Sequence, residues 1–452
     1  MVAVQSERAH LPAKLTITLW DFTWYTRTGP GEPFEDLDRA FSEARARGYN
    51  TVRVCAMPYL LFRSGLDTSR LTFEPFGGQY GQGTRWYDVK KTTTLDGRAQ
   101  LRSLLEGARR AGMFVILSSW EYQQSPSFLS DPRWFEELMA IPPDKRFLAL
   151  ADAWTDLLNY LDGLGLTDRV AYVELHNEVN ACKLTEAVAG DDPVIGMKPF
   201  LEKAIERMKS AHPTMSFTAC YAHPPLGKLR GVPTNADVFH VHPYVYGPLR
   251  ALMDRYELSG SAPFPQREAS SDLLLEGAPA LEEWGLPAEK AWKQRATGVG
   301  KRLFYTHDWA DGTKWDRWLY DHWGEYRGQM LERLELDLAV CADHAAARGI
   351  PAVVGEGYVG YTPLTSIFEA GPVGAAVSEL AVKRCAELGY WGTVVCSNSA
   401  PHHPAWADVS FQQRLNELFS GQALGPSRNT VSTEHRSDQP APEQAGKDRG
   451  ER

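Results

Sequence analysis

The sequence predicts a single (β/α)8 barrel, and three observations lead to this fold class. First, eight short apolar segments alternate with amphipathic helical segments along most of the chain. Second, glycines such as Gly48, Gly112 and Gly163 stand where helices are expected to stop. Third, polar and aromatic residues gather at the C-terminal ends of the expected strands, where such barrels place their active sites. Together these features favour a barrel over an open doubly wound sheet.

The expected strands are short runs of apolar residues, and they occur in the order 15–20, 50–55, 113–118, 170–175, 215–220, 238–241, 352–355 and 391–396. The expected helices between and after them are 33–47, 95–111, 144–161, 199–211, 315–348, 373–388 and 408–419. In the first helix Phe34, Leu37 and Phe41 are three and four residues apart, so they share one face.

The remaining segments divide the chain around the barrel. We expect residues 1–14 to be an N-terminal extension and residues 15–420 to form the barrel. A polar and aromatic insertion, residues 247–314, enlarges the loop after the sixth strand. The tail, residues 421–452, is rich in Pro, Ser, Gln and charge. Because it offers almost no apolar surface to bury, we expect it to be disordered.

Composition narrows the class of protein. The 452 residues hold 48 Lys and Arg against 57 Asp and Glu, a net charge of −9, which argues against a nucleic acid as partner. No run of about 18 apolar residues is present, so no membrane span is expected. The first 14 residues lack the apolar core of a signal peptide. The six cysteines have no paired spacing, which indicates a reduced, cytoplasmic protein.

Two glutamates at the strand ends indicate a chemistry. The residues at the expected strand ends are Trp20-Asp21, Arg53, Trp120-Glu121, Asn177-Glu178, Tyr221, His242-Pro243-Tyr244, Glu356 and Ser397-Asn398. Glu178 and Glu356 end the fourth and seventh strands, which face each other across the barrel mouth. Two such carboxyl groups can cleave a glycosidic bond, one as proton donor and the other as nucleophile or base.

Several motifs resemble those of clan A glycoside hydrolases, most closely glycoside hydrolase family 5 (cellulase-like) enzymes. The segments that carry the resemblance are 174–178 (Glu-Leu-His-Asn-Glu), 355–356 (Gly-Glu) and 242–244 (His-Pro-Tyr). The resemblance covers about residues 15–420. It implies that Glu178 is the general acid/base and Glu356 the nucleophile.

The same resemblance assigns supporting roles. It implies that Asn177 binds the sugar 2-hydroxyl, that Tyr244 hydrogen-bonds the nucleophile, and that Arg53 holds the nucleophile ionised. His242 completes this supporting group. No cofactor or metal is needed for the reaction.

Three positions depart from the family pattern. Val179 stands where the family usually has Pro, and the third strand ends in residues 118–121 (Ser-Ser-Trp-Glu) where a His is usual. The eighth strand ends in residues 396–398 (Cys-Ser-Asn) where a Trp that stacks on the sugar is expected. Trp20 and Trp120 are therefore our candidate sugar platforms, with Trp24 or a Trp of the insertion as alternatives.

The function we expect is hydrolysis of an O-glycosidic bond, with retention of configuration, in a soluble glycoside or oligosaccharide. An alternative is a cellulase-like barrel that binds sugar but has lost catalysis. A third reading is a metal-dependent hydrolase, because His240 and His242 form a His-x-His pair that places two imidazoles on one strand face.

Other residues receive structural interpretations. We expect Glu174 to be the buried partner of a basic group and His176 to be a barrel histidine whose hydrogen bonds are satisfied. Trp315, Trp318 and Trp323 lie at or near helical spacing, which favours packing of their helix over a role in a lid.

Overall fold

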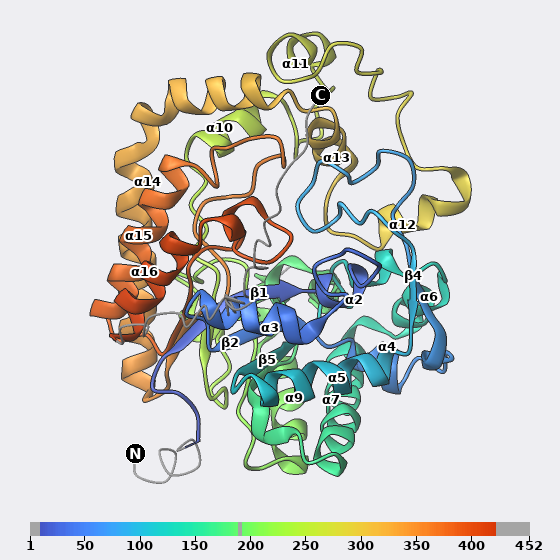
Figure 1. Ribbon diagram of the computed structural model, residues 1–452, viewed down its shortest axis with the longest axis vertical. Coiled ribbons are helices and arrows are strands. Elements are labelled where there is room, and N and C mark those ends of the chain that lie inside the picture. The colour runs from blue at the N-terminus through green and yellow to red at the C-terminus, as the bar shows by residue number, and fades with distance from the viewer. Residues whose placement is uncertain (1–9, 189–191, 422–452) are drawn as a thin grey trace, which may run out of the picture.

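The computed structural model describes residues 10–188 and 192–421, which form a parallel β-barrel surrounded by helices (Figure 1). The sheet order is β7-β6-β5-β2-β1-β11-β10-β9-β8. The barrel strands are β1 (Leu15–Asp21), β2 (Thr51–Cys55), β5 (Phe114–Ser118), β6 (Val170–Glu174), β7 (Phe217–Thr218), β8 (Cys220–Tyr221), β9 (Phe239–Val241), β10 (Ala352–Val354) and β11 (Gly392–Val394).

The expected (β/α)8 barrel is confirmed, with one difference in the fifth strand. The expected strand 215–220 is interrupted at Ala219, so it appears as the two short strands β7 and β8. β7 pairs with β6 and β8 pairs with β9, so the chain through Ala219 links the two ends of the sheet order. All residues of β1, β2, β5 and β6 are buried, as expected for strands covered on both faces.

Seven long helices form the outer layer close to their expected positions: α3 (Leu37–Ala46), α5 (Gly97–Arg110), α7 (Arg146–Gly163), α9 (Lys198–Ala211), α14 (Gly312–Arg348), α15 (Pro372–Glu387) and α16 (Val409–Ser420). Four of them begin after an aspartate whose carboxylate accepts a hydrogen bond from a backbone N–H of the first turn, and these caps are Asp36, Asp96, Asp311 and Asp408. Such caps fix where a helix starts.

The loops contain short helices and a small sheet. The small helices are α2 (Thr23–Thr26), α4 (Pro58–Phe62), α6 (Arg133–Ala140) and α8 (Pro193–Gly196). A two-stranded antiparallel sheet, β3 (Leu71–Phe73) with β4 (Thr93–Leu95), was not expected. It lies between the second strand and α5.

The insertion after the sixth strand folds into four short helices, α10 (Pro248–Arg255), α11 (Gln266–Asp272), α12 (Ala291–Arg295) and α13 (Lys301–Asp308). Figure 1 shows α10, α11 and α13 together in the upper part of the view, above the barrel strands. Trp284 stacks on Tyr80 with ring centroids 4.3 Å apart, so the insertion packs against the loop that follows the second strand. The expected packing role of the α14 tryptophans is confirmed, because Trp315 is fully buried and Trp318 and Trp323 are packed against the core.

Two other expectations concern the chain as a whole. No helix in the described ranges is long and apolar enough to cross a bilayer. All six cysteines are free and buried. The expectation of a disordered tail concerns residues that lie, except for Gly421, outside the described part of the chain.

Lys293 fastens α12 to the barrel and generates a first prediction. Its ammonium is buried and donates to the carbonyl oxygens of Ser127 (2.8 Å) and Leu129 (3.0 Å), with Glu74 at 3.3 Å. Lys293→Met leaves these buried acceptors without their donor, so we expect a loss of about 1–3 kcal/mol in the free energy of unfolding, measured by urea denaturation.

Lys290→Met is the matched control. Lys290 pairs with the same Glu74 oxygen at 2.9 Å, but its side chain is 25% exposed, so its removal should cost about 0–1 kcal/mol. Equal losses in the two variants would contradict the anchoring role of Lys293.

Candidate active site

A buried arginine lies at the centre of the barrel mouth. Arg53 on β2 donates from Nε and Nη2 to the two carboxylate oxygens of Glu174, at 2.8 and 2.7 Å. Its Nη1 donates to Oε1 of Glu356 at 2.8 Å, and Nη2 also reaches Oδ1 of Asn177 at 2.6 Å. One guanidinium therefore connects the ends of β2, β6 and β10.

Glu174 is the counterion of Arg53, as the sequence indicated. Burial alone would raise its pKa, but Arg53 and His240 outweigh burial and hold the pKa of Glu174 well below its usual range. His240 contributes through Nδ1, which lies 3.0 Å from Glu174 Oε1 and 2.9 Å from the Tyr172 hydroxyl. His176 is also satisfied, since Nε2 accepts from the Tyr122 N–H and Nδ1 donates to the Asn177 carbonyl.

Glu356 follows β10 and is held at both oxygens. Oε1 accepts from Arg53, and Oε2 accepts from the Tyr244 hydroxyl at 3.0 Å. The Tyr244 oxygen lies 2.7 Å from Ser397 Oγ, which accepts from the Gly357 N–H at 2.8 Å. The residue before Glu356 must be glycine, because a Cβ on Gly355 would lie 1.8 Å from Nε2 of His240.

Glu178 follows β6 in a different environment. Its backbone is left-handed, with φ at +44°, a conformation that is uncommon for non-glycine residues and recurs at active sites. Oε1 lies 3.0 Å from Nδ1 of His242, and Oε2 accepts from Nε2 of Gln123 at 2.8 Å. Burial raises the pKa of Glu178, although the Gln123 hydrogen bond and the charges of His223 and Arg53 oppose the shift.

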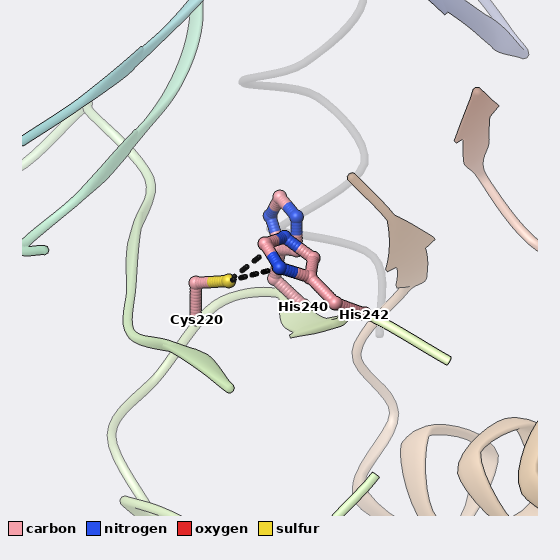
Figure 2. Close-up of side chains that lie close together, drawn as sticks. All are labelled: Cys220, His240 and His242. Carbon is pink, nitrogen blue, oxygen red and sulfur yellow. Dashed lines mark hydrogen bonds between the residues drawn. The ribbon is translucent and has the colours of Figure 1, made fainter. Parts of the chain in front are cut away.

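Cys220 determines which ring nitrogen of His242 carries the proton. Burial lowers the pKa of His242 well below its usual value, so the ring is neutral. Burial also raises the pKa of the Cys220 thiol well above its usual value, so the thiol keeps its proton. Figure 2 shows the Cys220 sulfur directed at the His242 ring, with Sγ 3.1 Å from Nε2. The thiol thus donates to Nε2, which leaves the Nδ1 proton for Glu178.

The two glutamates share a cavity of about 240 Å³. Its other lining residues include Asn177, Tyr244, Trp120, Trp86, Gln123, His223, Tyr246, Tyr361 and the insertion residues Gly298 and Val299. A larger cavity of about 880 Å³ lies between α10 and α14 and adjoins the first, because His223, Tyr244 and Tyr246 line both. The site is therefore a small chamber beside a wider one.

The structure brings together all but one of the expected site residues. Arg53, Asn177, Glu178, His242, Tyr244 and Glu356 form one hydrogen-bonded network, and Trp120 lines the cavity with the Arg53 guanidinium 4.7 Å from its ring centroid. The expectation that Trp20 is a sugar platform is wrong. Trp20 is fully buried against Phe34 and Phe41, at centroid distances of 5.1 and 4.7 Å, so it offers no surface to a sugar.

Sequence reasoning missed several lining residues. Gln123 lies two positions beyond Glu121, in the loop that continues from the expected third-strand end. Trp86 follows a stretch rich in glycine and aromatic residues, which was the one signal available for that loop. Tyr246 and Tyr361 lie beyond the ends of β9 and β10 in segments without periodicity.

Three groups of side chains among the described residues have the composition to hold a metal ion. They are Cys220 with His240 and His242, Glu178 with His242 and Glu356, and Asp21 with His402 and His403. In each group one possible ligand atom per residue lies within 4.8 Å of the others. The first two groups share His242 and belong to the network just described.

Known proteins resemble this chain in fold. Among solved structures, a protein from Parabacteroides distasonis ATCC 8503, provisionally named a glycoside hydrolase, is 19% identical, with a TM-score of 0.62 over 93% of this chain and 97% of that one. A tri-modular GH5 (subfamily 4) endo-β-1,4-glucanase from Bacillus licheniformis is 11% identical, with a TM-score of 0.47 over 91% of this chain and 60% of that one. An endo-1,4-β-D-mannanase from Thermotoga petrophila RKU-1 is 14% identical, with a TM-score of 0.43 over 84% and 87%.

At 19% identity the likeness to the Parabacteroides distasonis protein shows the fold alone. No curated protein sequence matches the chain. The family described as sugar-binding cellulase-like, however, matches residues 17–420, which is most of the chain and all of the barrel strands except the first residues of β1. This protein therefore belongs to the sugar-binding cellulase-like family.

Proposed function

We propose that this protein is a retaining glycoside hydrolase that cleaves an O-glycosidic bond, with Glu178 as general acid/base and Glu356 as nucleophile. One observation carries the proposal. Glu178 and Glu356 line one cavity, and facing oxygens of the two carboxyl groups lie within 4.8 Å of each other. Retaining enzymes separate their carboxyl groups by about 5–5.5 Å, whereas inverting enzymes need about 6.5–9.5 Å to admit a water.

The surroundings of the two carboxyl groups support different roles. Glu356 accepts from a cationic donor, Arg53, and from the Tyr244 hydroxyl, as suits a nucleophile that attacks as a carboxylate. Glu178 receives only neutral donors, His242 and Gln123, and burial raises its pKa. A carboxyl group that holds its proton can donate it to a leaving oxygen.

The reaction then proceeds in two steps. Glu178 protonates the glycosidic oxygen while Glu356 attacks the anomeric carbon, which breaks the bond and forms a glycosyl ester. Glu178, now ionised, removes a proton from water as the water attacks the same carbon and releases Glu356. Each step inverts the configuration, so the product retains it.

The cavities suggest how a substrate is divided. We assign the sugar that reacts to the small chamber and the leaving portion to the wider cavity beside it. Asn177 accepts from Arg53 and donates through Nδ2 to Gln123 at 2.7 Å. This leaves one amide proton for a sugar hydroxyl, in agreement with the role the resemblance implies. The carbohydrate partner in this proposal is a soluble glycoside or oligosaccharide.

A sugar-binding protein without turnover is the second candidate. It is favoured by the end of β11, where Ser397 occupies the region in which a stacking Trp is expected, and its hydroxyl contacts Tyr244. Titration calorimetry with mono- and oligosaccharides that shows binding, while the wild type hydrolyses no member of an aryl glycoside panel, would support this candidate and reject the hydrolase.

Substitution of the two carboxyl groups tests the hydrolase. We expect Glu356→Gln to abolish turnover, because no nucleophile remains. Glu178→Gln should lower kcat/KM by about 10²–10⁴-fold on glycosides with poor leaving groups and much less on dinitrophenyl glycosides, which need no proton. Steady-state kinetics measures both, and NMR of the first-formed product reports its configuration.

Two outcomes would reject the assignment. One is a wild type that turns substrate over with both variants fully active. The other is an inverted first-formed product, which would leave Glu356 without the role of nucleophile. Full loss of activity on removal of metal with a chelator would instead support a metal-dependent reaction.

The raised pKa of Glu178 predicts a pH dependence. The proton on Glu178 is needed for the first step, and burial raises the pKa at which that proton leaves. We therefore expect kcat/KM for a substrate with a poor leaving group to fall as the pH rises through a pKa above the ordinary glutamate value. In Glu178→Gln the residual activity should lack this basic limb, and an unchanged limb would assign it to another group.

Trp86 is the candidate sugar platform that replaces Trp20. It lines the cavity, and the Arg85 guanidinium lies 4.3 Å from its ring centroid. Aromatic faces bind the C–H faces of sugars, so Trp86→Ala should raise KM more than it lowers kcat. Trp20→Phe is the control, because Trp20 is buried away from the cavity and its substitution should leave KM unchanged. A normal KM in Trp86→Ala would reject the platform role.

A further inference from the structure

A second cluster of polar side chains lies beside the catalytic cavity and takes no part in the proposed reaction. It consists of Asp21 at the end of β1 with His402 and His403, which lie between β11 and α16. Both ring nitrogens of each histidine and Oδ2 of Asp21 are buried and have no hydrogen-bond partner within residues 10–188 and 192–421. Buried polar atoms are nearly always paired, so five unpaired atoms in one place call for a ligand.

The backbone directs Asp21 into this cluster. The pairing of β1 with β2 shifts register between Leu19 and Asp21, and Asp21 has a left-handed φ of +42°. Irregularities of this kind re-aim a side chain at the rim of a barrel. Oδ1 accepts the backbone N–H of Thr23 at 2.7 Å, which leaves Oδ2 free of protein partners in the described chain.

The histidine loop is held in place from both sides. Ser399, just before it, accepts a hydrogen bond through its carbonyl from Oγ1 of Thr18 on β1 at 2.8 Å. Trp406, just after it, stacks on Tyr49 with an interplanar angle of 3°. The two imidazole rings therefore lie in a fixed segment, with centroids 3.8 Å apart.

The donor set fits a transition-metal ion. One carboxylate oxygen of Asp21 and one nitrogen from each histidine lie within 4.8 Å of one another. Zinc binds imidazole and carboxylate at about 2.0–2.2 Å, which puts neighbouring donors about 3.4 Å apart in a tetrahedron, so small side-chain rotations bring these three together. We propose that Asp21, His402 and His403 form a binding site for a divalent transition-metal ion, with Zn²⁺ the best match to two imidazoles and one carboxylate.

Nearby positive charges are already neutralised. Arg27 pairs with Asp88, and Arg85 pairs with Glu369. Each arginine therefore has its own counterion, so Asp21 remains available to a metal ion.

In the other two groups of possible metal ligands, side chains already hydrogen-bond to one another or to their neighbours. In the barrel interior Cys220 hydrogen-bonds His242, whose other nitrogen faces Glu178. His240 Nδ1 is held by Glu174, and its Nε2 lies against Gly355. Only the Asp21 group, among the three, presents donors on every member that no other described residue uses.

A metal ion at this site would join the end of β1 to the loop after β11. Because Asp21 also lines the catalytic cavity, the ion would fix one wall of that cavity. The inference does not depend on hydrolysis, since it rests on a different set of side chains and its test measures metal binding.

The test is zinc binding by the full chain. Protein stripped with EDTA and dialysed against Zn²⁺ should retain one ion per chain, measured by elemental analysis. The double variant His402→Ala/His403→Ala should retain none. Co²⁺ in place of Zn²⁺ should give visible d–d absorption without a thiolate charge-transfer band, since no sulfur belongs to the site. Zinc should raise the unfolding temperature of the wild type and leave that of the double variant unchanged.

Two further variants keep the test decisive. Asp21→Asn is nearly isosteric, so it should fold normally yet bind zinc more weakly than the wild type. His344→Ala removes a histidine on α14 that also has an unpartnered buried nitrogen but belongs to none of the three groups, and it should bind zinc as the wild type does.

Three results would overturn the proposal. They are a wild type that retains no zinc, equal retention by the wild type and both Asp21→Asn and the double variant, and zinc that persists in the double variant but is lost in Cys220→Ser. The last result would place the ion in the barrel interior.

Discussion

The buried guanidinium of Arg53 is the interaction on which the site depends. Its side chain has no exposure, and it is surrounded by Glu174, Asn177 and Glu356. A buried charge that loses a partner costs about 3–5 kcal/mol, so the barrel is stable only when these groups are near their observed positions. The two parallel hydrogen bonds to Glu174 fix the plane of the guanidinium, and this plane directs Nη1 at Glu356. The requirement to neutralise one charge thus positions the proposed nucleophile.

Glu174 also separates the behaviour of the two proposed catalytic carboxyl groups. It accepts two of the hydrogen bonds of Arg53, and although burial opposes the shift, Arg53 and His240 hold the pKa of Glu174 below its usual range. Glu178 is left with uncharged donors, because burial keeps His242 neutral and the thiol of Cys220 leaves the ring proton on Nδ1. Burial then raises the pKa of Glu178. The two glutamates at the barrel mouth therefore differ chemically, because a third glutamate, Glu174, already pairs with the positive charge of Arg53.

The fold was predictable from sequence because a barrel strand buried on both faces is a short apolar run, and eight such runs separated by amphipathic helices allow few other architectures. The network around Arg53 followed from the strand ends for the same reason. Trp20 shows where this reasoning fails. Side chains alternate along a strand, so neighbours at a strand end face opposite ways, and the irregular pairing between Leu19 and Asp21 turns Asp21 toward the cavity and leaves Trp20 against α3.

The loops were less predictable. Trp86, Tyr246 and Tyr361 reach the cavity from loop segments in which no periodicity indicates a facing side. The interruption at Ala219 had no signal either, because the apolar run continues through it. Sequence therefore indicated the proposed catalytic groups, which strands position, and missed the other residues that line the cavity, which loops position.

Because strands position the proposed catalytic groups and loops position the rest of the cavity lining, the two sets of residues can change separately. In the family pattern a Trp on the last strand supports the sugar, whereas here Ser397 binds Tyr244 and Gly357, and so helps to hold Glu356. The aromatic surface lies instead on Trp86 and on residues of other loops, with Gly298 and Val299 of the insertion closing the chamber. Loops tolerate substitution better than barrel strands do. A cavity walled in this way can exchange one sugar for another while the carboxyl groups and Arg53 stay unchanged, because Trp86, Gly298 and Val299 are not among the groups that neutralise the buried charge.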